Sequence, residues 1–250
     1  MALEIVFIGI LGAAVGSFLN VVAYRVPRKQ SVVSPNSRCP GCETPISPRD
    51  NVPVLSWLWL RGRCRHCGEP ISPRYPIVEL ITALAFAGVA LARGVDRDLI
   101  LELPFVAVLI AVAAIDLEHR KIPNVITGPA AIYAVIVGAL FFTSDLPELL
   151  IAGSAAFAAL LLAALAYPAG MGMGDVKLAG VMGLYLGAAV GPAMFVAFLA
   201  GTVGGLAVMA RQGTGRKTGV PFGPFLALGA LVGLLAGPEL IDLYKDEFLA

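Results

Sequence analysis

Charged residues are scarce in this chain of 250 residues. Only 14% are Asp, Glu, Lys or Arg, whereas roughly a quarter are charged in an ordinary soluble domain. The sequence also lacks low-complexity tracts and any fixed period of about 20–50 residues, which argues against disorder and against a repeat architecture. The scarcity of charge argues in addition against a soluble globular protein.

Apolar residues, in contrast, make up 58% of the chain, and their runs recur from one end to the other. They are too many for one water-soluble core, so we expect a lipid bilayer to be the solvent. We predict an all-α polytopic membrane protein with about eight transmembrane helices, near residues 3–24, 77–92, 99–115, 125–142, 149–167, 176–191, 192–210 and 222–238. Three of these runs are short for a span, and only Gly191-Pro192 separates the sixth run from the seventh. Six or seven spans therefore remain alternatives.

The placement of lysine and arginine predicts the orientation. With the amino terminus outside, the inner segments hold fifteen of the eighteen basic residues, nine of them in residues 25–74. The positive-inside rule therefore favours both termini outside and the 25–76 loop in the cytoplasm. The first run lacks a basic leading region and a small-residue cleavage site, so we expect a retained span over 1–24. Residues 77–250 form the membrane core in this interpretation.

All four cysteines lie in the predicted cytoplasmic loop. They form two Cys-x-x-Cys pairs separated by 21 residues, namely Cys39, Cys42, Cys64 and Cys67. This spacing is typical of a structural zinc ion bound by four thiolates, and Pro40, Gly41 and Gly68 favour the turns that each pair needs. Two disulfides or unrelated thiols are the alternatives, although disulfides are rare in the cytosol. His66 is interpreted as a solvated side chain.

The same loop is rich in proline and poor in apolar residues. We therefore expect a small zinc-ribbon-like module that depends on its metal. Its apolar residues are interpreted as a small core, and insertion into the lipid headgroup region is the alternative; they are Leu55, Trp57, Leu58, Trp59 and Leu60.

Ionisable residues at membrane depth are costly and call for a functional hypothesis. Glu102 is expected at the outer end of its span, in reach of water. Asp116 ends the third apolar run and Asp175 begins the sixth, so both lie at one depth near the cytoplasmic face. Two carboxyl groups that share one proton act as base and acid in hydrolysis. The alternative is that Asp175 caps its helix and Asp116 is an interfacial acid.

Several motifs in order resemble the prepilin peptidases, also called type IV leader peptidases, which are membrane aspartyl proteases of the Gly-x-Gly-Asp class. The resemblance covers nearly the whole chain. Its motifs are Gly16-Ser-Phe-Leu-Asn20-Val-Val22, the two cysteine pairs, Asn51-x-Pro53, Arg74-Tyr-Pro-x-x-Glu79, Asp116 with Ile122-Pro123, Gly172-Met-Gly174-Asp175-x-Lys177 and Pro221-Phe-Gly223-Pro224.

The resemblance implies that Asp116 and Asp175 are a catalytic dyad that activates water. Such enzymes remove the basic leader of type IV prepilins and of type II secretion pseudopilins, cutting after glycine at the cytoplasmic face of the bacterial inner membrane. Members with the large first loop also methylate the new amino terminus with S-adenosylmethionine. The implied partners are therefore prepilins, pseudopilins and the lipid bilayer, and no nucleic acid.

The remaining candidates border these groups. Gly172 and Gly174, beside Asp175, allow the backbone to unwind or approach closely, which leaves room for an extended substrate strand. The resemblance places the motif with Pro221 and Gly223 near the dyad, where it would shape the cleft, and an ordinary helix-entry turn is the alternative. Lys177 is counted with these cleft residues. There is no glycine-rich nucleotide fingerprint after a strand, so the methyl-donor site cannot be placed in that way. Asn20, Arg74 and Glu79 are candidates for methyl transfer, although each of them can equally brace the loop against the first two spans.

Two other functions remain alternatives. The first is a transporter in which Asp116, Asp175 and Glu79 relay protons or cations. The second is a membrane scaffold with a zinc module. Acids that cluster at the cytoplasmic end, rather than at mid-membrane in several spans, argue against the relay.

Overall fold

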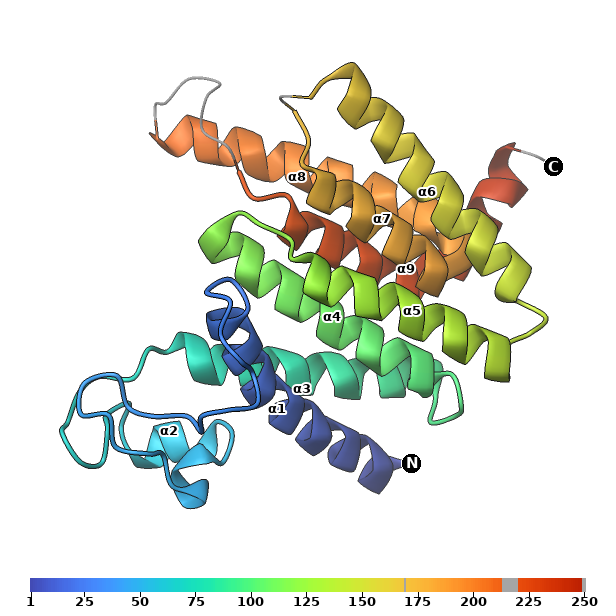
Figure 1. Ribbon diagram of the computed structural model, residues 1–250. Coiled ribbons are helices and arrows are strands. Elements are labelled where there is room, and N and C mark those ends of the chain that lie inside the picture. Colours follow the sequence, from blue (N-terminus) through green and yellow to red (C-terminus); the bar gives the residue numbers. More distant parts are fainter. Residues whose placement is uncertain (169, 213–219, 249–250) are drawn as a thin grey trace. The chain divides into compact units, whose positions relative to one another are not determined.

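The chain is almost entirely helical. The computed structural model describes residues 1–168, 170–212 and 220–248 (Figure 1). Long helices in this part are α1 (Ala2–Arg25), α3 (Arg74–Arg93), α4 (Leu99–His119), α5 (Asn124–Phe141), α6 (Leu146–Ala166), α7 (Met173–Leu186), α8 (Val190–Gln212) and α9 (Gly223–Phe248). Short helices are η1 (Pro48–Asn51), α2 (Leu55–Trp59) and η2 (Gly187–Ala189). The prediction of an all-α polytopic fold is confirmed.

By length and composition, 6 segments of the described residues are suited to cross a membrane. Five of them are α1, α3, α4, α5 and α6, and the sixth is the stretch Met173–Ala210, which contains both α7 and α8. Gly223–Gly237, within α9, is a shorter apolar helix. The apolar runs of the sequence therefore correspond to helices, while α7 and α8 follow each other with only a short interruption.

The predicted position of that interruption is wrong. Helix α7 ends at Leu186, and the break falls at Gly187, whose φ of 55° and ψ of −135° interrupt the helix. The backbone N–H of Ala188 donates to Glu148 Oε1 at 3.0 Å, which satisfies a donor at the break. Pro192, expected in the separator, lies in the first turn of α8, where a missing N–H costs no hydrogen bond.

The chain divides into two compact units, Met1–Ala114 and Ile115–Ala250. In the first unit α1 packs along α3, and glycines allow a very close approach. A Cβ added at Gly16 would lie 2.7 Å from Glu79 Cα, and one at Gly12 would lie 2.8 Å from the Thr82 carbonyl oxygen. Residues with side chains at these two positions would push the helices apart.

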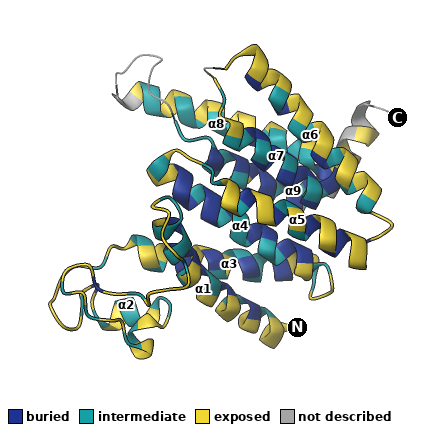
Figure 2. Ribbon diagram, viewed as in Figure 1, coloured by how far each residue is buried: buried dark blue, intermediate teal, exposed yellow. Residues whose placement is uncertain are grey.

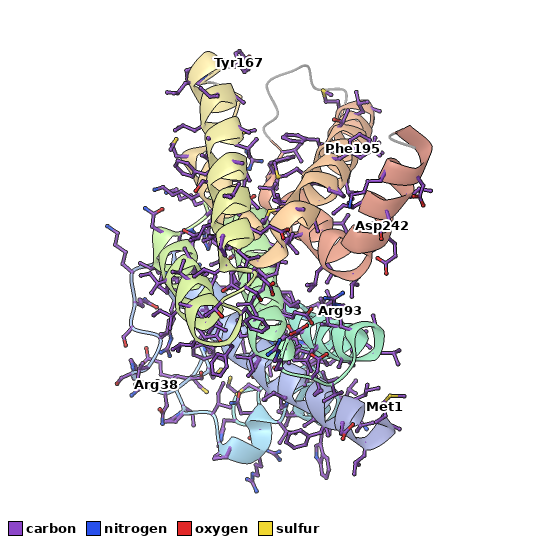
Figure 3. The ribbon with its side chains drawn as sticks, turned by 90° about the vertical axis from the view of Figure 1, so that its right-hand side faces the viewer. Met1, Arg38, Arg93, Tyr167, Phe195 and Asp242 are labelled. Carbon is purple, nitrogen blue, oxygen red and sulfur yellow. The ribbon has the colours of Figure 1, made fainter. Side chains whose placement is uncertain are left out.

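The expectation that Glu102 is in reach of water is wrong. Glu102 lies in the first turn of α4. This side chain is buried rather than in contact with water, and Arg93 Nε donates to its Oε1 at 2.9 Å. Figure 3 labels Arg93 at the end of α3. The ion pair supplies the charge partner that a buried carboxylate requires.

In the second unit α6 packs on α7 and α8 packs on α9. Its core includes Leu178, Met182 and Leu226, which are fully buried. Large apolar side chains also lie on the exterior of both units, for example Leu91, Ile151 and Phe195. Figure 2 shows exposed residues along most of the long helices. Such exposure is expected for surfaces that face lipid rather than water.

The close contact of α1 and α3 gives a first prediction. In Gly16→Ala the added methyl group meets the backbone of α3, so overpacking should destabilise the protein by about 1–3 kcal/mol. Gly88→Ala, on α3 itself, is the matched control, because a Cβ there has nothing within 4 Å. Thermal unfolding in detergent should show a lower Tm for Gly16→Ala only. Equal Tm values for the two variants would contradict the packing described here.

Candidate functional site

Asp116 lies near the end of α4 and is only 5% exposed. Its Oδ2 accepts a hydrogen bond of 2.8 Å from the backbone N–H of Gly223, the first residue of α9. The first N–H groups of a helix have no partner within the helix, and they carry its positive dipole end. The amino terminus of α9 therefore stabilises the ionised form of this carboxyl group.

The close contact between Asp116 and the first residue of α9 depends on the absence of a side chain at Gly223. A Cβ at Gly223 would lie 2.8 Å from Asp116 Oδ2 and 2.9 Å from Asp116 Cβ. Phe222 positions the start of α9 by packing on Phe198 of α8, with ring centroids 5.4 Å apart. Pro221 directly precedes Phe222 in the segment that leads into the helix. The motif Pro221-Phe-Gly-Pro224 thus brings a backbone donor to the acid.

Asp175 lies in the first turn of α7. Its Oδ2 accepts from the backbone N–H of Gly172 at 3.2 Å, which forms a capping box at the start of the helix. The alternative prediction of a helix cap therefore describes its contact correctly. The cap uses only Oδ2 of Asp175, so Oδ1 can still accept a hydrogen bond or a proton from another group.

The two aspartates are brought together within the Ile115–Ala250 unit. Asp116 and Asp175 are close enough for their charges to interact. Gly174 contributes to this arrangement, since a Cβ there would lie 2.8 Å from Ile122 Cβ, in the segment that follows α4. The arrangement gives a pair of carboxyl groups, each with one backbone donor.

Lys177, on the next turn of α7, donates from Nζ to Asn124 Oδ1 at 2.9 Å. Asn124 begins α5 directly after Ile122-Pro123. Asn124 was not among the predicted site residues. Its position directly after the Ile122-Pro123 motif is the feature of the sequence that could have indicated it. The contact holds Lys177 at the same end of the unit as Asp175.

The three methyl-transfer candidates lie in the first unit and join its parts. Asn20 Nδ2 donates to the Tyr75 carbonyl oxygen at 3.0 Å, and Arg74 Nη2 lies 3.4 Å from the Ala114 carbonyl oxygen. Glu79, which is 7% exposed, accepts from the Val54 N–H at 2.7 Å through Oε2. The Asn20 contact joins α1 to α3, the Arg74 contact joins α3 to α4, and the Glu79 contact joins the loop to α3.

Val54 itself has an unusual backbone. Its φ of 61° and ψ of −51° are rare for a β-branched residue. A conformation of this kind costs of order 1–3 kcal/mol and persists only where its surroundings hold it. The hydrogen bond to Glu79 is one such contact, so the loop is fixed to α3 directly before α2.

The four cysteines form one cluster. Their sulfurs all lie within 4.8 Å of one another, and Cys39 Sγ is 3.7 Å from Cys67 Sγ. Zinc bound tetrahedrally at about 2.3 Å requires sulfurs roughly 3.8 Å apart. None of the four is in a disulfide, and His66 is not part of the cluster. The donor set and spacing therefore fit a closed four-thiolate site.

The two cysteine pairs have nearly the same local structure. The N–H groups of Cys39 and Cys64 donate to the carbonyl oxygens of Thr44 and Glu69, at 3.0 and 2.8 Å. The residues with positive φ are Glu43 (56°) in the first turn and Gly68 (74°) in the second. Gly68 thus has the role expected of it, whereas Glu43 rather than Gly41 takes the left-handed conformation.

Hydrogen bonds at the cluster favour the thiolate form of two of the cysteines. Hydrogen bonds from the Thr44 side chain and backbone lower the pKa of the Cys42 thiol to about 6. The backbone N–H groups of Cys67 and His66 lower the pKa of Cys64. A thiolate is the form that binds metal, so the lowered pKa values of Cys42 and Cys64 favour binding of a cation. At Cys67 a hydrogen bond with the Glu69 backbone lowers the pKa, but burial and hydrogen bonds with the other three cysteines raise it to about 12.

The cluster gives a second prediction. Purified protein should contain about one zinc ion per chain, and Cys64→Ser should lose most of it because three thiolates remain. His66→Ala, inside the same turn but outside the cluster, should retain the metal. Elemental analysis of the protein in detergent measures this. Full zinc occupancy in Cys64→Ser would refute the site.

Comparison with known proteins adds independent information. Residues 10–93 match the family model described as "Bacterial Peptidase A24 N-terminal domain", and residues 103–209 match the "Type IV leader peptidase family". No solved structure matches the chain.

Several curated relatives are similar over most of their length. A "Prepilin leader peptidase/N-methyltransferase" of Bacillus subtilis is 32% identical, over 97% of this chain and 97% of its own. A protein of the same name from Aeromonas hydrophila is 32% identical over 94% of this chain and 91% of its own. A "Type 4 prepilin-like proteins leader peptide-processing enzyme" of Escherichia coli is 36% identical over 88% and 89%. The resemblance seen in the sequence is thereby confirmed, and the chain belongs to the type IV leader peptidase family.

Proposed function

We propose that this protein is a bifunctional prepilin leader peptidase and N-methyltransferase. The observation that carries the peptidase half is the proximity of the Asp116 and Asp175 carboxyl groups, each with a backbone N–H donor. The names of the relatives support both halves. The substrates are prepilins and pseudopilins, which the enzyme cuts after a glycine at the end of their basic leader.

In the proposed reaction one aspartate is ionised and the other is protonated. The ionised carboxylate takes a proton from water, whose oxygen attacks the carbonyl carbon of the glycine. The protonated carboxyl group donates a hydrogen bond to the carbonyl oxygen and stabilises the tetrahedral intermediate. The C–N bond then breaks, the amine leaves with a proton, and the leader leaves with a carboxylate terminus. The N–H groups of Gly223 and Gly172 stabilise the ionised forms.

The cleft residues have supporting roles in this proposal. The absence of side chains at Gly172, Gly174 and Gly223 keeps the backbone close to the acids and leaves room for an extended peptide. Lys177 and Pro221 flank that space at the starts of α7 and α9. Residues 77–250 are assigned as the peptidase core, residues 25–76 as the cysteine module and residues 1–24 as the first span.

The proposed location is the bacterial inner membrane, with the 25–76 loop in the cytoplasm and both termini outside. Fifteen of the eighteen basic residues lie on the cytoplasmic side in this topology, in agreement with the positive-inside rule. Basic leaders are kept in the cytoplasm by the same rule. Cleavage at the cytoplasmic face therefore requires the aspartates at that depth.

Two cofactors belong to the proposal. A zinc ion bound by Cys39, Cys42, Cys64 and Cys67 would be structural, because a site closed by four thiolates has no open position for substrate. S-adenosylmethionine would supply the methyl group for the new amino terminus. Asn20, Arg74 and Glu79 border its proposed site, where Arg74 and Glu79 offer charges for its carboxylate and ammonium groups.

The dyad gives a third prediction. Asp116→Asn and Asp175→Asn should each lower the cleavage rate by at least about 10²–10⁴-fold, because neither amide transfers protons. Asp145→Asn is the matched control, since Asp145 is an exposed acid before α6. The measurement is mass spectrometry of a model prepilin incubated with enzyme and S-adenosylmethionine. Loss of the leader with one added methyl group is expected for the wild type and for Asp145→Asn.

Other outcomes are informative as well. Cleavage at the wild-type rate by either dyad variant would refute the catalytic assignment. An intact substrate with folded, zinc-loaded wild-type protein would instead favour the relay or scaffold functions, neither of which predicts hydrolysis.

Gly223 gives a fourth prediction. The methyl group of Gly223→Ala would displace the Asp116 carboxylate or the start of α9, and small displacements of catalytic groups cost up to about 10²-fold in rate. Gly205→Ala, on the neighbouring α8, is the control, because a Cβ there meets nothing within 4 Å. The initial rate of leader cleavage should fall only in Gly223→Ala. Equal rates in the two variants would show that the close contact is dispensable.

A further inference from the structure

The short helix α2 in the cysteine module has an apolar face that the described residues leave uncovered. Leu55, Leu58 and Trp59 are 66%, 58% and 82% exposed. Their spacing of three and four residues places them on one side of a helix. Figure 2 shows that exposed residues dominate this part of the module.

The opposite side of α2 is the one that packs inside the module. Trp57 Nε1 donates to the Ile71 carbonyl oxygen at 3.0 Å, and its ring contacts Gly62, where a Cβ would lie 2.9 Å away. The interpretation of both tryptophans as a small core is therefore right for Trp57 and wrong for Trp59. One indole is held by the module, and the other points away from it.

The uncovered face of α2 lies next to the beginning of α3, which is one of the segments suited to cross a membrane. Val54, which directly precedes α2, is bonded at 2.7 Å to Glu79 in the second turn of α3. Large apolar residues of this end of α3 are exposed as well, namely Ile77, Leu80 and Ile81. Both elements belong to the Met1–Ala114 unit, and Figure 1 shows the module at the end where α3 begins. The two exposed apolar surfaces thus lie near one membrane boundary.

The charges of the chain segment that contains α2 are predominantly positive. Residues 49–65 contain four arginines and one acid, Asp50. Arg65 donates to Asp50 at 2.6 Å and balances that acid. Arg61 and Arg63, which follow α2 directly, are exposed. An apolar face with tryptophan and adjacent arginines suits the interface of a bilayer that contains anionic lipids.

We propose that α2 is an interfacial anchor: Leu55, Leu58 and Trp59 insert into the headgroup boundary of the bilayer that holds α1 and α3, while Arg61 and Arg63 bind anionic headgroups. The indole suits this position because its ring is apolar and its N–H bonds to water or headgroups. The anchor fixes the cysteine module against the membrane surface. This inference depends on the membrane-spanning fold and not on the proposed peptidase chemistry.

The test uses the fact that the chain has only 2 tryptophans. The full-length protein is placed in nanodiscs of phosphatidylcholine and phosphatidylglycerol, with and without brominated acyl chains, and tryptophan fluorescence is recorded. The variant Trp59→Phe reports on Trp57 alone, and its difference from wild type reports on Trp59. We expect brominated lipid to quench Trp59 several-fold more strongly than Trp57, and iodide in the buffer to quench Trp59 only weakly.

Two results would overturn the proposal. Strong iodide quenching of Trp59 without lipid quenching would place the face in water. Protection of Trp59 from both quenchers would mean that protein covers it, either a second copy of the chain or another partner. Neither readout depends on leader cleavage, so failure of the anchor and failure of the peptidase function are distinguishable.

The arginines are tested separately. In the double variant Arg61→Gln/Arg63→Gln, lipid quenching of Trp59 should lose its dependence on the phosphatidylglycerol content. Arg38→Gln is the matched control, since Arg38 lies in the first cysteine turn, away from α2 in the sequence. If quenching depends on phosphatidylglycerol equally in the double variant and the control, the assignment of Arg61 and Arg63 to headgroups is refuted.

Discussion

A carboxylate in a low-dielectric environment needs a hydrogen-bond donor, and this requirement organises the part of the molecule that holds the proposed catalytic aspartates. Asp116 obtains its donor from the backbone of Gly223, more than a hundred residues later in the chain. For that bond to form, α9 must begin beside the end of α4, residue 223 must lack a side chain, and Phe222 must hold the turn against α8. The hydrogen bond between Gly223 and Asp116 thus fixes where α9 begins relative to the end of α4.

The same solution recurs at the other acids of the candidate sites. Asp175 accepts from the Gly172 N–H, and Glu79 accepts from the Val54 N–H. In each bond the donor is a backbone N–H at the start of a helix, namely Gly223 for α9, Gly172 for α7 and Val54 for α2. The acids therefore hold these helix starts in the places where chemistry is proposed. Stability and reactivity are therefore linked, because replacing one of these acids leaves a backbone donor unsatisfied as well as removing a reactive group.

The sequence predicts the helices and the cysteine cluster because each depends on local information. Apolar runs of spanning length and paired Cys-x-x-Cys turns are visible without knowledge of the fold. The break at Gly187 and the contact of Lys177 with Asn124 were not predicted, since they involve neighbours distant in the chain. The different environments of Trp57 and Trp59 were missed for a similar reason: only the packing of Ile71 and Gly62 around one indole distinguishes them. The left-handed Glu43 lies in a local turn, where Gly41 was the residue expected to give the backbone its freedom.

The use of backbone donors also affects how the family can vary. A contact between two side chains leaves a record in evolution, because a change in one residue favours a matching change in the other. Main-chain N–H groups are supplied by every amino acid except proline, so the partners of Asp116, Asp175 and Glu79 leave almost no such record. Correlated substitutions would therefore fail to reveal the bonds that hold these acids, and at Val54 the hydrogen bond itself would exclude only proline.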